Sequence, residues 1–178
     1  FHEAGLFDAH DLDEADLNRF FGPEKRYPEF QEGRLLSFFC NTHSHVVLKE
    51  KEIRTQRPHG YILQAQSRFI ADESLVSTTC WAYGVFNSHL TQGNTNFNIL
   101  LSVCANPFHT VRENGQRIFV ETDGKYCLLG VPSAFEMGLN SCRWIYKNTD
   151  HCFEVRTWTS KRKPVVNLSF RVLQGGPV

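Results

Sequence analysis

The sequence predicts an all-β fold: a large antiparallel β-sandwich with a short helix or irregular segment at its N-terminus. Within residues 165–172, apolar and polar side chains alternate strictly from Val166 to Val172, which is typical of a strand with one buried face. Asp123-Gly124 lies between two further strand-like runs and favours a tight hairpin, because both turn positions need positive φ. Roughly ten short strands in a chain of 178 residues suit two packed sheets better than one open sheet.

The first 32 residues are predicted to form an acidic segment that leads into the sandwich domain, which then spans residues 33–178. This segment carries nine acidic and three basic side chains. Within it, residues 8–21 favour a short helix with Asp11 as its N-cap. A Gly-Pro pair ends that helix, and Pro28 keeps the following residues irregular.

The sandwich region divides into runs of β-branched, aromatic and aliphatic residues separated by turn residues. The longest apolar run, residues 75–88, favours one central strand, while residues 96–103 favour either a strand or a short helical turn. Residues 132–138 form a connection too apolar for a free loop, so we expect it to pack against another element. The other predicted strands are 35–40, 45–51, 61–66, 116–122, 125–131, 143–147, 152–159 and 165–172.

The charge balance gives no global electric field that would attract a polyanion. Lysine plus arginine and aspartate plus glutamate each total 19, so we expect no nucleic-acid partner. No stretch has the roughly 20 apolar residues that a membrane helix needs. Residues 1–22 lack the basic start and apolar centre of a signal peptide. We therefore expect no membrane partner.

The six cysteines lie singly inside apolar runs, where a free thiol packs as a small hydrophobic group. Disulfides stay open as an alternative, since the number is even but the spacing fixes no connectivity. No pair of cysteines has the short spacing usual for structural zinc. His43, His45 and His59 could hold a metal ion together with a further ligand, but exposed turn histidines are ordinary. We predict no metal site and no cofactor.

The most unusual polar segment is residues 93–98, Gly-Asn-Thr-Asn-Phe-Asn. Asn94, Asn96 and Phe97 combine planar amides with a ring, which suits the hydroxyls and the apolar face of a sugar. In the alternative interpretation, the asparagines bond to their own backbone in a tight connection. Trp81 is a further candidate sugar contact.

Charged candidates are scattered along the chain. Arg117 could clamp a carboxylate or phosphate with two parallel hydrogen bonds, or could pair with Glu121 on the same strand face. Glycoside hydrolysis would need two carboxylates that flank the bond. Spacing singles out no such pair, and no nucleophile elbow or phosphate-binding loop is present, so we predict no autonomous catalytic residue. The candidate carboxylates are Asp72, Glu73, Glu121, Glu136 and Glu154.

Several stretches form a set that resembles a known family. They are residues 35–39, 45–52, 57–60, 93–98, 100–103, 115–120, 129–138 and 143–147. Together they resemble the sandwich region of very large bacterial glycoside phosphorylases of the cellobiose-phosphorylase type. The likeness covers about residues 33–172 and is greatest to β-1,2-oligoglucan phosphorylases and related β-glucan phosphorylases.

The resemblance implies a supersandwich-like fold that supports an (α/α)6 catalytic barrel, for which this sequence offers no candidate helices. In such enzymes the general-acid Asp and much of the phosphate site lie in the barrel, where inorganic phosphate attacks the anomeric carbon with inversion. The expected partners are that barrel and a β-glucooligosaccharide, with inorganic phosphate as co-substrate of the whole enzyme. We also expect a cytoplasmic location and leave a homodimer open. The alternatives are a stand-alone carbohydrate-binding sandwich and a structural or interaction domain.

Overall fold

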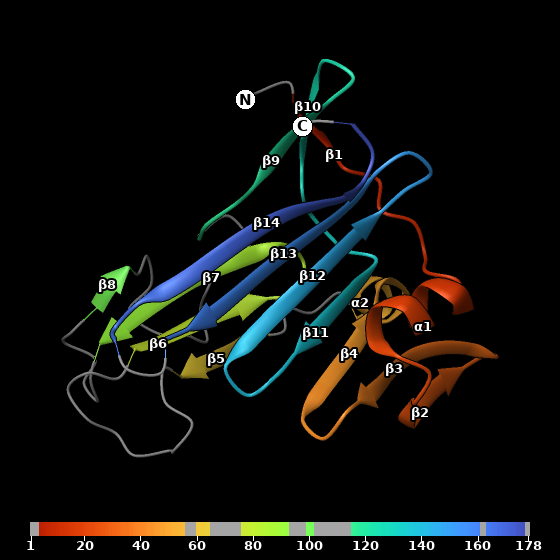
Figure 1. Ribbon diagram of the computed structural model, residues 1–178, viewed down its shortest axis with the longest axis horizontal. Helices are drawn as coiled ribbons and strands as arrows, with labels where there is room; N and C mark the ends of the chain where they lie inside the picture. Colours follow the sequence, from red (N-terminus) through yellow and green to blue (C-terminus); the bar gives the residue numbers. More distant parts are fainter. Residues whose placement is uncertain are drawn as a thin grey trace.

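The computed structural model describes residues 4–55, 60–64, 76–92, 99–101, 115–160 and 163–176. Within these residues the chain is mostly strand, with two short helices (Figure 1). The predicted all-β, antiparallel class is confirmed. The described strands form three sheets, one more than the two expected.

Seven strands form the largest sheet: β2 (Arg26–Gln31), β3 (Arg34–Cys40), β4 (Ser44–Leu48), β11 (Ala134–Met137), β12 (Ser141–Lys147), β13 (Cys152–Thr159) and β14 (Val166–Gln174). Their order across the sheet is β14-β13-β12-β11-β4-β3-β2, and all neighbours are antiparallel. Strand β2 lies within the predicted acidic segment, and the predicted boundary between residues 32 and 33 stays a prediction.

Strand β11 corrects the expectation that residues 132–138 are a connection. It pairs with β4 and with β12, so it lies in the middle of the largest sheet. Ala134 and Phe135 are both buried there, which explains the apolar composition of this stretch. A strand buried on both faces lacks the alternation that identifies strands in a sequence.

Two smaller sheets complete the fold. Strands β5 (Gly60–Gln64), β6 (Val76–Trp81), β7 (Val85–Gln92) and β8 (Ile99–Leu101) form one of them. Strand β1 (Gly5–Leu6) is parallel to β10 (Lys125–Leu128), which pairs in turn with β9 (Phe119–Thr122). The predicted hairpin turn between β9 and β10 is confirmed, since Asp123 has φ 52° and Gly124 has φ 71°.

The single strand predicted over residues 75–88 is wrong, because the chain turns between β6 and β7. Gly84 makes this turn with φ +86°. A Cβ atom at Gly84 would lie 2.2 Å from the carbonyl oxygen of Leu129, so only glycine fits at this close approach. The run lacks the alternation of a half-buried strand because both strands and the turn are largely buried.

Two helices lie beside strands β3 and β4 (Figure 1). Helix α1 (Glu14–Phe21) begins at Asp13, whose Oδ1 accepts a hydrogen bond from the backbone N–H of Asp16 at 2.8 Å. The predicted cap, Asp11, is therefore wrong by two residues. Helix α2 (Lys49–Thr55) replaces the end of the strand predicted over residues 45–51, since its straight-chain Lys and Glu residues favour a helix. Of the described helices, neither is long and apolar enough to cross a membrane.

The main core lies between the inner face of the largest sheet and the two smaller sheets. We define the inner face as the one that carries Phe135, Trp144 and Val155. These three residues pack in one cluster with Cys80 of β6 and Phe86 of β7. The polar groups inside this core are paired; for example, Trp144 Nε1 donates to the carbonyl oxygen of Trp81 at 3.1 Å. The five described cysteines are free, as expected, and all but Cys127 are buried; Cys104 lies outside the described residues.

Candidate functional site

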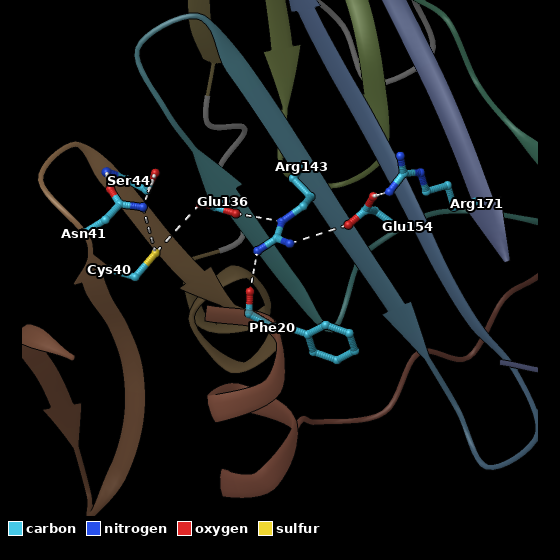
Figure 2. A network of polar contacts seen from close by, with 8 residues as sticks. All are labelled: Phe20, Cys40, Asn41, Ser44, Glu136, Arg143, Glu154 and Arg171. Carbon is cyan, nitrogen blue, oxygen red and sulfur yellow. Dashed lines mark hydrogen bonds and ion pairs between the residues drawn. The ribbon is translucent and has the colours of Figure 1, made fainter. Parts of the chain in front are cut away.

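The opposite, outer face of the largest sheet carries charged side chains that converge from several strands. Glu136 lies on β11, Arg143 on β12, Glu154 on β13 and Arg171 on β14 (Figure 2). Strand register sets these residues side by side, because Glu136 pairs with Arg143 and Glu154 pairs with Arg171. Their neighbours in sequence, such as Trp144 and Val155, point to the inner face, as strand alternation requires.

Arg143 is the centre of this network. Its Nε donates to Glu136 Oε2 at 2.7 Å, and its Nη1 donates to Glu154 Oε2 at 3.5 Å. Its Nη2 donates to the carbonyl oxygen of Phe20 at 2.8 Å (Figure 2). Phe20 lies in the last turn of α1, where unpaired carbonyls carry partial negative charge and favour a cation. The guanidinium also lies over the ring of Phe21, 5.0 Å from its centroid.

The two carboxylates have further partners at the edges of the network. Glu154 Oε1 lies 3.9 Å from Arg171 Nη1, and the Arg171 side chain is 70% exposed. On the other side, the Cys40 thiol donates to Glu136 Oε1 at 3.8 Å. Burial, and next the Glu136 carboxylate, raise the pKa of Cys40 to about 11. At neutral pH Cys40 is therefore a protonated donor and a poor nucleophile.

Two open cavities lie along this outer face. The first has a volume of about 330 Å³ and is lined by Phe20, Phe21, Cys40, Asn41, Ser44, Glu136, Ser141, Arg143 and Arg156. The second has a volume of about 310 Å³ and is lined by Glu154, Arg156, Trp158, Ser169 and Arg171. Arg156 lines both cavities, so they are neighbours on β13. We call the two cavities together the outer-face groove.

The network does not have the geometry of a hydrolytic pair. Glu136 and Glu154 face one guanidinium instead of two sides of an empty space for a sugar bond. The arrangement instead fixes the positions of β11, β12, β13 and the end of α1. Of the other candidate carboxylates, Glu121 is exposed, and its hydrogen bond raises the pKa of Tyr126. Asp72 and Glu73 lie outside the described residues.

The sequence-predicted binding residues do not meet at this groove within the part of the chain that is described. Asn94, Asn96 and Phe97 lie outside the described residues. Arg117 donates to the Gly84 carbonyl at 3.5 Å and lies 5.9 Å from the ring centroid of Tyr83. Burial lowers its pKa, an effect that the nearby tyrosines oppose. Arg117 as a ligand-binding residue stays a prediction.

Trp81 corrects one expectation, since it is not an exposed sugar platform. Its side chain is buried, and its Nε1 donates to Ser88 Oγ at 3.0 Å. The histidine metal site also lacks support: His45 stacks on Phe39, with ring centroids 4.6 Å apart. His59 lies outside the described residues, and within those described no group of three metal-ligating side chains comes together.

The sequence did contain a signal for the groove that our interpretation missed. Glu154, Arg156 and Trp158 occur at every second position of the strand predicted over residues 152–159, so alternation places all three on one face. The pairing of this strand with its neighbours adds Arg143 and Arg171 to the same face. Asn41, in the turn before β4, and Ser44, the first residue of β4, come from a distant part of the chain, and the pairing of β4 with β11 brings them near.

The chain is similar to known proteins over most of its length. Residues 22–176 match the glycoside phosphorylase supersandwich domain. A 1,2-beta-oligoglucan phosphorylase of Listeria innocua serovar 6a (strain ATCC BAA-680 / CLIP 11262) is 40% identical over 135 residues. These residues are 76% of this chain but only 12% of that enzyme, so the chain spans a small fraction of its relative's length. The chain belongs to the glycoside phosphorylase supersandwich domain family.

Proposed function

We propose that this chain is the non-catalytic supersandwich portion of an inverting phosphorylase that acts on β-1,2-oligoglucans. In this proposal it supports a catalytic barrel supplied elsewhere in the same enzyme, with inorganic phosphate as co-substrate. The observation that carries the proposal is the 40% identity to an oligoglucan phosphorylase, confined to 12% of that enzyme. Seven-eighths of the relative thus lies outside the match and is available for the chemistry.

The contacts of the charged side chains support a non-catalytic role. The two glutamates that meet on the outer face, Glu136 and Glu154, are both bonded to Arg143. Cys40 is held protonated by burial and by Glu136, so it is not an activated nucleophile. The substrate, the barrel, a cytoplasmic location and a homodimer follow from the family resemblance and stay predictions.

A mass measurement combined with an activity assay tests the proposal. The protein would be isolated from its source with an antibody to this chain, its intact mass measured, and phosphorolysis of β-1,2-glucooligosaccharides followed by release of sugar 1-phosphate. We expect a polypeptide far heavier than 20.5 kDa that is active. We expect the 178-residue chain alone to release no sugar 1-phosphate.

A pair of variants controls for the contribution of the outer face. Glu136→Gln and Glu154→Gln should each leave measurable phosphorolysis in the intact enzyme, because in our proposal neither carboxylate takes part in breaking the glycosidic bond. Loss of all turnover in a folded variant, or turnover by the isolated chain, would contradict the non-catalytic role.

A further inference from the structure

We propose that the outer-face groove binds a segment of an oligoglucan, so that this domain itself holds part of the glucan chain. The inference rests on the proposed function for the class of sugar. The groove itself is defined by the two cavities that meet at Arg156.

The length of the groove favours an extended ligand over a single ion. Between Ser44 on β4 and Arg171 on β14, its lining crosses β11, β12 and β13. These five strands are neighbours in the sheet. With about 4.8 Å between neighbouring strands, the groove crosses roughly 19 Å of sheet. A lone phosphate would fill only a small part of it.

Among the residues that the structure describes, some hydrogen-bond donors of the lining have no acceptor. The side chain of Arg156 is exposed, and within the described residues its one recorded contact is with the ring of Trp158, 5.9 Å from the centroid. Arg143 uses three of its five N–H donors on Glu136, Glu154 and Phe20. Ser44 Oγ accepts a hydrogen bond from Asn41 at 3.3 Å, which leaves its own O–H to donate. Sugar hydroxyl and ring oxygens accept such bonds.

Trp158 supplies the apolar part of the proposed site. Its side chain is half-buried on the outer face of β13, in the cavity that also contains Glu154 and Ser169. An indole ring beside planar charged groups suits the C–H face of one pyranose and the hydroxyls around it.

The charge of the groove favours a neutral ligand. Its three arginines and two glutamates leave a small positive excess, located at Arg156. Arg143 and Arg171 each face a glutamate. A neutral oligoglucan would meet no strong field here, whereas a polyanion would meet the two carboxylates.

Nuclear magnetic resonance of the 178-residue chain tests the site directly, because the chain has three tryptophans. Titration with β-1,2-glucooligosaccharides should shift the indole N–H signal of Trp158. The indoles of Trp81 and Trp144 donate inside the protein, to Ser88 and to the Trp81 carbonyl, so their signals should stay in place. The double variant Arg156→Ala plus Trp158→Ala should bind at least tenfold more weakly.

Matched variants and a second titrant keep the test decisive. Arg34→Ala and Tyr27→Ala remove an exposed arginine and an exposed aromatic side chain from β3 and β2, and both should bind as the wild type does. Circular dichroism and urea unfolding establish that each variant is folded. The inference is overturned if oligosaccharide leaves the Trp158 signal unmoved, or if inorganic phosphate alone shifts it equally. Those results would leave the proposed function untouched, since phosphorolysis by the intact enzyme tests it separately.

Discussion

The two faces of strands β12 and β13 differ in how their side chains are paired. On the inner face, Trp144, Phe153 and Val155 are 0% exposed and pack against each other and the smaller sheets. On the outer face, Arg143 and Glu154 form a polar network beside open cavities. The same strands thus present a closed apolar surface on one side and an open charged surface on the other.

Because of this difference, we assign stability mainly to the inner face and ligand binding to the outer face of the same strands. Burial of apolar area stabilises the fold by about 25 cal/mol per Å², so the inner face contributes most of the stability. Exposed ion pairs contribute little, typically ~0–1 kcal/mol each, so exposed positions of the outer face such as Arg171 can vary without unfolding the domain. We expect substitutions on the inner face to change stability and substitutions on the outer face to change ligand binding.

The largest expected effect compares two tryptophans on opposite faces. Trp144→Ala should lower the free energy of unfolding by about 3–5 kcal/mol, because it removes a fully buried ring from the core. Trp158→Ala should lower it by less than about 1 kcal/mol, since its ring is half-buried at the surface. Urea unfolding followed by circular dichroism measures both. Equal losses for the two variants would break the distinction between the faces.

The second comparison lies within the outer face itself. Arg143→Ala should cost about 1–3 kcal/mol, between the values for exposed and buried ion pairs, because it leaves two largely buried carboxylates without their shared cation. Arg171→Ala should cost less than about 0.5 kcal/mol, since this side chain is 70% exposed. Thermal unfolding at neutral pH distinguishes them. A cost for Arg171→Ala as large as that for Arg143→Ala would show that the network does not depend on burial.

Much of the fold could be predicted because local signals agree with the final structure. The Asp123-Gly124 hairpin and the strand predicted over residues 152–159 both reappear as expected. Prediction failed where tertiary contacts override local pattern. Residues 76–88 show no regular alternation because two adjacent strands are largely buried together, so no period in the sequence divides them. Strand β14 is an edge strand, so its alternating apolar residues Leu168 and Val172 are over one third exposed.

The candidate site was harder to predict than the fold. Glu136 and Glu154 were among five candidate carboxylates, but nothing local joins them to Arg143. Their meeting depends on register between three strands and on the end of α1, which supplies the Phe20 carbonyl. Trp81 was proposed for sugar contact because of its residue type, and its burial follows from the packing of the second sheet.

The third prediction concerns the helix that borders the outer face. Asp13→Ala should destabilise the domain by about 1 kcal/mol, because it removes the side-chain acceptor that caps α1. Asp11→Ala is the matched control and should cost almost nothing, although the sequence pattern favours it as the cap. The Phe20 carbonyl in α1 accepts a hydrogen bond from Arg143. Loss of the cap should therefore also reduce the contribution of Arg143 to the free energy of unfolding. A double-mutant cycle of Asp13→Ala with Arg143→Ala measures that coupling.

The smallest expected effect is a pH dependence at the far edge of the largest sheet. Hydrogen bonds from Lys51 and then Ser37 lower the pKa of Glu29 on β2 below its ordinary value of 4.5. A carboxyl group whose pKa is lower in the folded than in the unfolded protein stabilises the fold. This contribution is complete above the unfolded-state pKa and is lost as the pH falls through the folded-state pKa. Glu29→Gln should therefore be less stable than wild type at pH 7, and the difference should shrink below about pH 4.5. In a Lys51→Met background the same substitution should show almost no pH dependence, because the main cause of the shift is gone. A difference that persists at low pH would mean that Glu29 acts through packing, as residues of the inner face do, and not through its charge.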